Sequence, residues 1–148
     1  IESVQSLFPP IISNTSITTH ILNTFPDKLR IAQKTFHETG GLHAAALFAT
    51  DGSMMGIRED VGRHNAVDKI IGHSFLTETD LSTLILMVSG RVSFEIMQKA
   101  LAHKIPIVAA ISAPTSLAVE FATENKQALV GFMRNNKMNI YAGHEYIN

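Results

Sequence analysis

The chain has 148 residues, of which 45% are apolar and 17% charged, and a formal net charge of −1 at pH 7. This length suits a single domain over residues 1–148, and the balanced charge argues against a nucleic-acid partner. No apolar run reaches the roughly 18 residues of a membrane helix, and no basic, apolar leader opens the chain. We therefore expect a soluble, cytoplasmic protein without a membrane partner.

Cysteine is absent from the 148 residues. Disulfides, thiolate metal sites and a thiol nucleophile are thereby excluded within them. The first residue is Ile1 rather than Met, and no start signal follows it. We expect the sequence to be a fragment or a processed product of a longer protein.

In the first half of the chain, the spacing of apolar residues predicts helices and a hairpin. In chain order these elements are a turn with a short helix or strand (11–23), a helix (26–38), two strands (43–49 and 53–57) and a helix (65–71) that stops at Gly72. Asp51-Gly52 between the two strands is a common hairpin turn pair.

In the second half, buried strands alternate with helices over short links. In chain order we expect a strand (81–88), a helix (94–103), a strand (105–111), a helix (117–125), a strand (128–133) and a hairpin at 135–137 into a last strand (138–141). Such alternation is typical of parallel strands covered by helices. The fold class is therefore predicted to be α/β, a three-layer α/β/α sandwich with a mixed, mostly parallel sheet.

Three polar segments follow predicted strands and lead into helices, namely 58–65, 89–93 and 112–116. The carboxyl ends of strands are where sheets of this kind bind ligands. Backbone N–H groups and hydroxyls at helix starts, with Arg63, His64 and Arg91 near them, suit a phosphate. Ordinary helix capping by Ser and Thr explains the same residues, so both interpretations stay open.

The sequence contains no strong cofactor motif. A Gly-Lys-Ser/Thr phosphate loop, a dinucleotide glycine fingerprint, a paired-Cys zinc pattern and a nucleophile elbow are all missing. His43 and His64 each lack a second ligand at usable spacing, so we expect no metal site.

Several segments together resemble the formate dehydrogenase accessory sulfurtransferase family, the FdhD/NarQ type. They are 40–45, 58–69 (REDVGRHNAVDK), 89–91, 112–118 and 131–134. The resemblance runs from about Phe8 to Tyr141 and implies a sulfurtransferase that passes sulfur from a cysteine desulfurase to the molybdenum cofactor of formate dehydrogenase. It also implies a cytoplasmic homodimer. The family's sulfur-carrying Cys-x-x-Cys loop is expected before Ile1, so no catalytic residue is expected in this chain.

The family is similar in fold to the cytidine deaminases, which implies a cytidine-deaminase-like architecture. In those enzymes two helix starts hold zinc through His and Cys, with a Glu as proton shuttle. The corresponding helix starts here are His64-Asn65-Ala66 and 89–93, where the thiolates and the carboxylate are missing. Zinc-bound hydroxide chemistry is therefore not expected.

The ligand implied by the resemblance is the bis-molybdopterin guanine dinucleotide form of the molybdenum cofactor, with GDP as a mimic. The residues expected to bind it are Phe132, Met133, Arg134, Asn135, Asn136, Lys137, Arg63, His64, Ser89, Gly90, Arg91, Ser112 and Thr115. From the residues alone, 132–137 also fits a simple polar hairpin turn. Two other functions fit the chain: a cofactor-binding chaperone without sulfur chemistry, and a nucleotide deaminase or hydrolase.

Overall fold

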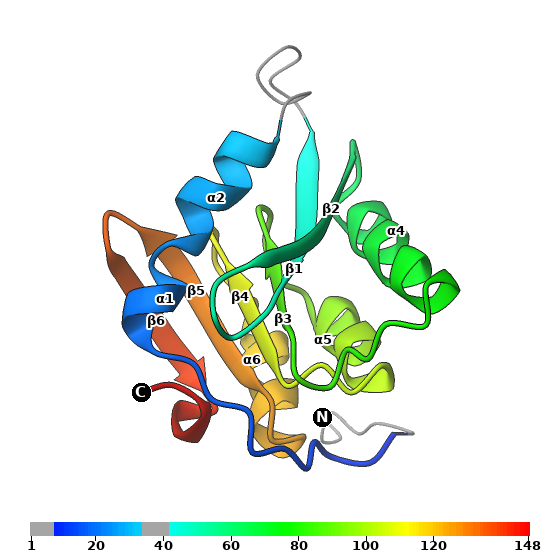
Figure 1. Ribbon diagram of the computed structural model, residues 1–148. Helices are drawn as coiled ribbons and strands as arrows, with labels where there is room; N and C mark the ends of the chain where they lie inside the picture. Colours follow the sequence, from blue (N-terminus) through cyan, green and yellow to red (C-terminus); the bar gives the residue numbers. More distant parts are fainter. Residues whose placement is uncertain (1–7, 34–41) are drawn as a thin grey trace.

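One mixed sheet forms the middle layer of the domain (Figure 1). The computed structural model describes residues 8–33 and 42–148, and within these ranges the sheet has six strands. In spatial order the strands are β2 (Met54–Asp60), β1 (His43–Phe48), β3 (Ile85–Val88), β4 (Ile107–Ala110), β5 (Ala128–Arg134) and β6 (Lys137–Ala142).

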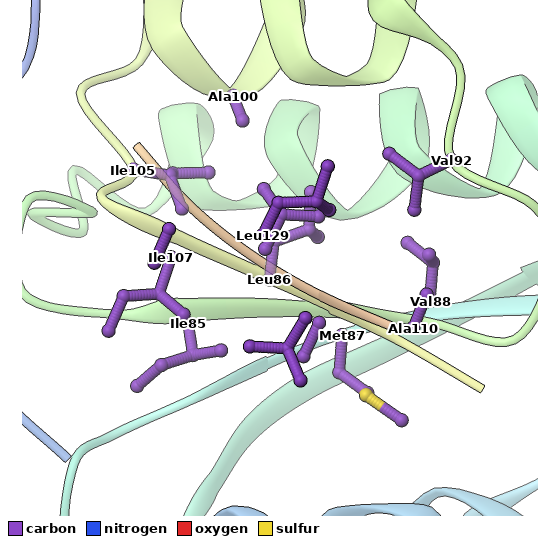
Figure 2. Packing of buried hydrophobic residues seen from close by; sticks show 14 of the residues in the cluster. Ile85, Leu86, Met87, Val88, Val92, Ala100, Ile105, Ile107, Ala110 and Leu129 are labelled. Atoms are coloured by element: carbon purple, nitrogen blue, oxygen red, sulfur yellow. The ribbon is translucent and has the colours of Figure 1, made fainter. Parts of the chain in front are cut away.

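Helices cover both faces of this sheet. They are α1 (Thr19–Leu22), α2 (Phe25–Ala32), α4 (Arg63–Leu76), α5 (Phe94–Ala102), α6 (Ser116–Glu124) and the short 3₁₀ helix η1 (His144–Tyr146). The chain runs from β2 through α4 to β3, and then through α5 to β4 and α6 to β5, always in one direction across the sheet. Right-handed crossovers therefore place α4, α5 and α6 on one face, and α2 lies on the other (Figures 1 and 2). The predicted three-layer α/β/α fold is confirmed.

The prediction of a mostly parallel sheet is wrong. Two pairings, β3 with β4 and β4 with β5, are parallel, whereas β1–β2, β1–β3 and β5–β6 are antiparallel. The reason is that hairpins flank the parallel centre. The chain reverses at Asp51-Gly52 and again at Asn135-Asn136, and a chain that reverses at a tight turn must pair antiparallel.

The core lies on both faces of the central strands. All four residues of β3 are at most 2% exposed, as expected for a strand covered by helices on both sides. In Figure 2, Leu86 and Val88 point toward the α5 side, where Ala100 lies, while Ile85 and Met87 point to the opposite face. A strand alternates its side chains in this way, so four consecutive apolar residues supply both halves of the core.

Two aromatic rings attach α2 to its face of the sheet. Phe25, at the start of the helix, stacks on Phe48 of β1 with ring centroids 3.9 Å apart and planes at 12°. Phe25, Phe48 and Leu29 are fully buried. The contact fixes where the rest of α2 lies relative to the sheet.

Several predicted boundaries differ from the structure. Helix α4 begins at Arg63 and continues through Gly72 to Leu76, because Ser74, beyond the exposed Gly72, is buried and donates to the Ile70 carbonyl oxygen at 2.9 Å. Strand β2 extends to Asp60, since His43 to Ala45 pair with residues 58–60. Strand β3 begins only at Ile85. The described part of the predicted helix 26–38 ends at Ala32, and 34–41 lie outside the described residues.

Helices long and apolar enough to cross a membrane are not found in the two described ranges of the chain.

A candidate anion-binding cleft at the carboxyl edge of the sheet

The strand directions bring the predicted polar segments to one edge of the sheet. Strands β2, β3, β4 and β5 all run the same way, so their last residues lie at the same edge, together with the start of the antiparallel strand β1. We call this the carboxyl edge. It carries His43, the turn after Asp60, the segments after Val88 and Ala110, and the β5–β6 hairpin.

A cleft of about 520 Å³ opens at the carboxyl edge between α2 and the strand ends. Four of its lining residues belong to the predicted site: Ser89, Met133, Arg134 and Asn135. The others were not predicted as site residues, and they are Pro26, Asp27, Arg30, Gln33, Leu42, His43 and Ile111. Arg30 and Arg134 give the cleft two guanidinium groups, so it can receive a phosphate-bearing ligand.

The β5–β6 hairpin supplies Arg134 and Asn135 through a tight two-residue turn. Asn135 and Asn136 both have positive φ, 53° and 59°, and Arg134 pairs with Lys137. Positive φ at both central residues is the pattern of a type I′ turn, which Asn tolerates better than most residues. The predicted hairpin at 135–137 is therefore confirmed. Turn and ligand site need not exclude each other, because the turn directs Arg134 into the cleft.

A bulge in β5 precedes this hairpin. The strand register shifts between Gly131 and Arg134, and Phe132 has a φ of 52°, an unusual value for a large side chain. Its N–H donates to the carbonyl oxygen of Ser112 at 3.1 Å. Phe132 remains 39% exposed while Met133 is buried.

Phe132 lines a second, shallower hollow of about 430 Å³. Its lining is Phe132, Arg134, Asn135, Lys137, Met138 and Asn139. Arg134 and Asn135 therefore border both the hollow and the cleft.

Ser89 lines the cleft beside β1, and Gly90 follows it behind His43. The Ser89 N–H donates to the Ala44 carbonyl at 3.0 Å, and the Ser89 hydroxyl oxygen accepts from the Ala44 N–H at 2.9 Å. The hydroxyl proton can still donate to a ligand. At Gly90 an added Cβ would lie 3.0 Å from His43 Nδ1 and 3.4 Å from Arg63 Cβ. Glycine thus lets the His43 ring lie against the backbone.

His64 and Ser93 connect the starts of α4 and α5. His64 Nε2 lies 3.0 Å from Ser93 Oγ, and this oxygen caps α5 by accepting from the Ile96 N–H. The two helix starts singled out by comparison with deaminases are therefore in contact. Among the described residues, no group of three His, Asp or Glu side chains is placed to hold a metal ion.

The remaining predicted residues lie around the cleft and are not part of its lining. Thr115 caps α6 through the Ala118 N–H, and Arg91 is exposed. Arg63 is half-buried, with an Nε atom that has no hydrogen-bond partner in the described chain. Their role in ligand binding stays a prediction.

Asp60 anchors the turn between β2 and α4. Its carboxylate accepts from the Lys69 ammonium and the Gly62 N–H, each at 2.8 Å. These two contacts, Lys69 first, lower the pKa of Asp60 from its usual 3.8 to about 2. The motif residue Lys69 thereby holds the turn that leads into Arg63 and His64.

Acid is expected to destabilise the protein in part through Asp60. Because its folded-state pKa is lowered from 3.8 to about 2, the stabilisation is complete above the higher value and disappears as the pH falls through the lower one. Urea unfolding of the wild type and Asp60→Asn at a series of pH values between neutral and acidic measures this. The variant should lose less stability than the wild type on acidification. If the free energies of unfolding of the two proteins fell in parallel with pH, Asp60 would not be a source of the acid sensitivity.

Taken together, the fold and the cleft define a class of protein: a mixed α/β domain with an arginine-lined cleft at the carboxyl edge of its sheet. The chain belongs to the FdhD/NarQ family, whose model matches residues 2–148.

Named relatives agree with this membership. The chain is 51% identical over 140 residues to the sulfur carrier protein FdhD of Streptomyces coelicolor, covering 94% of this chain and 48% of the relative. It is 52% identical over 140 residues to the Mycobacterium tuberculosis protein of the same name, covering 94% and 51%. The archaeal Sulfurisphaera tokodaii protein is 48% identical over 135 residues, covering 90% and 53%. The chain thus spans about half the length of these relatives.

A solved structure also shares the fold. A crystal structure from Desulfotalea psychrophila, described as a formate dehydrogenase accessory protein, superposes with a TM-score of 0.87 at 26% sequence identity. The match covers 95% of this chain and 60% of the other.

Proposed function

We propose that this chain is the ligand-binding body of a sulfur carrier that serves formate dehydrogenase. Relatives that match most of the chain are named sulfur carrier protein FdhD, and the structural neighbour is described as a formate dehydrogenase accessory protein. The observation that carries the proposal is the cleft, in which Arg30 from α2 and Arg134 from β5 line the same space. The bound substrate is the molybdenum cofactor in its bis-molybdopterin guanine dinucleotide form.

The cleft suits one nucleotide arm of this substrate. A volume of about 520 Å³ lies within the range of small-molecule sites. Each of the two guanidinium groups, of Arg30 and of Arg134, can bind two phosphate oxygens at once. Leu42 and Ile111 add apolar surface against which a base can lie.

The sulfur chemistry requires a thiol that these 148 residues do not contain. In this proposal a Cys-bearing segment elsewhere in the full protein receives sulfur from a cysteine desulfurase as a persulfide, a form in which a thiolate can pass sulfur on. The body described here holds the cofactor beside that segment. A cytoplasmic homodimer and a cytidine-deaminase-like fold belong to the same proposal.

A cofactor-binding chaperone without sulfur chemistry is the second candidate. The absence of cysteine from the chain favours it for this domain. Loading the full-length protein with sulfur from a cysteine desulfurase and measuring its intact mass separates the two. A mass increase of one sulfur supports the carrier, and an unchanged mass supports the chaperone.

Titration calorimetry with GDP tests the cleft. We expect GDP to bind and Arg134→Ala to weaken the affinity by about ten- to a hundredfold, the effect of losing one charged hydrogen-bonding partner. Lys126→Ala is the matched control, because Lys126 is an exposed cation just before β5, at the opposite edge of the sheet. Absent GDP binding, or equal effects of the two substitutions, would show that the assignment is wrong.

A further inference from the structure

An acidic residue lies in the lining of a cleft that is otherwise suited to anions. Among the described lining residues, Asp27 is the only acidic one, and Arg30, Arg134 and His43 share the cleft with it. Asp27 also borders a smaller hollow of about 150 Å³ at the β5–β6 turn, beside Arg134 and Asn135. The negative charge of Asp27 repels phosphate, so phosphate binding does not explain why a carboxylate lies in this cleft.

The local contacts of Asp27 leave it accessible to a ligand. It lies in the first turn of α2, and its Oδ1 is 2.9 Å from Arg30 Nη2, one helical turn further on. The side chains of Arg30 and Asp27 are 61% and 70% exposed, so this ion pair contributes little to stability.

We propose that Asp27 reads the base of the bound nucleotide and selects guanine, an inference that rests on the nucleotide-bearing ligand proposed above. The N1–H and the 2-amino group of guanine are adjacent donors that match the two oxygens of a carboxylate, which only accepts hydrogen bonds. Adenine presents a lone pair at N1, and xanthine presents a carbonyl at C2. Both would face the carboxylate with an acceptor.

The rest of the cleft agrees with this orientation of the nucleotide. Arg134 lies on the β5–β6 hairpin, and Asp27 lies on α2, so the two charges come from different walls. Half-buried Leu42 and Ile111 provide apolar surface for a base. A base edge on Asp27 and phosphates on Arg134 therefore match the opposite charges of the two walls.

Competition among four diphosphates tests the proposal by calorimetry. The wild type is expected to bind GDP more tightly than XDP and ADP by about tenfold or more. The affinity for IDP should lie between that for GDP and those for XDP and ADP, because hypoxanthine keeps the N1–H but lacks the 2-amino group. Asp27→Asn replaces one carboxylate oxygen by a donor, which matches the C2 carbonyl of xanthine. The variant is expected to reverse the preference, so that XDP binds more tightly than GDP.

Arg30→Gln is the matched control, since it breaks the same ion pair but keeps the carboxylate. Its GDP-to-XDP affinity ratio should equal that of the wild type, even if all four nucleotides bind more weakly. Asp27→Glu, which keeps both oxygens, should retain the preference for GDP. Thermal unfolding of each variant verifies that it is folded.

The outcomes separate this inference from the proposed function. If the wild type binds GDP but Asp27→Asn leaves the GDP-to-XDP ratio unchanged, base reading by Asp27 is wrong while the cleft still binds nucleotide. If GDP does not bind to the wild type at all, both proposals fail. A reversed ratio in Asp27→Asn, with an unchanged ratio in Arg30→Gln, supports both.

Discussion

Phe25→Ala is expected to lower the free energy of unfolding by about 3–5 kcal/mol, the cost of removing a large aromatic side chain from a core. Phe25 is fully buried and stacks on Phe48 at 3.9 Å. Because this stack attaches α2 to the sheet, the substitution should also weaken GDP binding, since Asp27 and Arg30 lie on the same helix. Denaturant unfolding and calorimetry measure the two effects.

Phe75→Ala provides the control for Phe25→Ala. Phe75 lies near the end of α4 and is 76% exposed. Its removal should change stability by no more than about 0.5 kcal/mol, as for most surface substitutions. Similar losses for both variants would mean that α2 is not attached to the sheet through the Phe25–Phe48 stack.

Gly143→Ala is expected to destabilise the protein by about 2–5 kcal/mol, through a left-handed backbone and a steric clash together. Gly143 has a φ of 74°, and a Cβ there would lie 2.4 Å from Ala128 Cα and 2.7 Å from Ala128 N. These are backbone atoms at the start of β5, which cannot move without disturbing the sheet. Denaturant unfolding measures the loss.

The same substitution at Gly72 should have the opposite sign. Gly72 lies inside α4, and an added Cβ would meet nothing within 4 Å. Alanine there should stabilise the helix by about 0.5–1 kcal/mol, because glycine is unfavourable in a helix interior. Destabilisation by Gly72→Ala, or tolerance of Gly143→Ala, would contradict the packing described.

Turns and helix starts, whose signals lie in a few neighbouring residues, were predicted correctly from the sequence. Asp51-Gly52 and Asn135-Asn136 are turn pairs whose preference lies in the residues themselves, and both turn where predicted. The helices starting at Phe94 and Ser116 have Ser93 and Thr115 as their caps. Capping was one of two interpretations kept open for these segments, and it is confirmed for both residues.

Features that depend on distant partners were not predicted. Residues 58–60 were placed in the polar segment after the predicted strand 53–57, yet pairing with residues 43–45 makes them the end of β2. The contribution of α2 to the cleft depends on contact between Phe25 and Phe48, which are far apart in the chain. Helical periodicity shows that α2 has a buried face, but it cannot show over which strand end the helix lies.

The turn at Asn135-Asn136 restricts how the protein can vary. A two-residue turn sets the register of both strands, and in a strand a shift by one residue exchanges the two faces. One inserted or deleted residue would therefore turn Arg134 or its partner Lys137 away from its present side. During evolution this wall of the cleft can therefore change through substitution of its side chains, whereas a change in the length of the turn would remove the present wall.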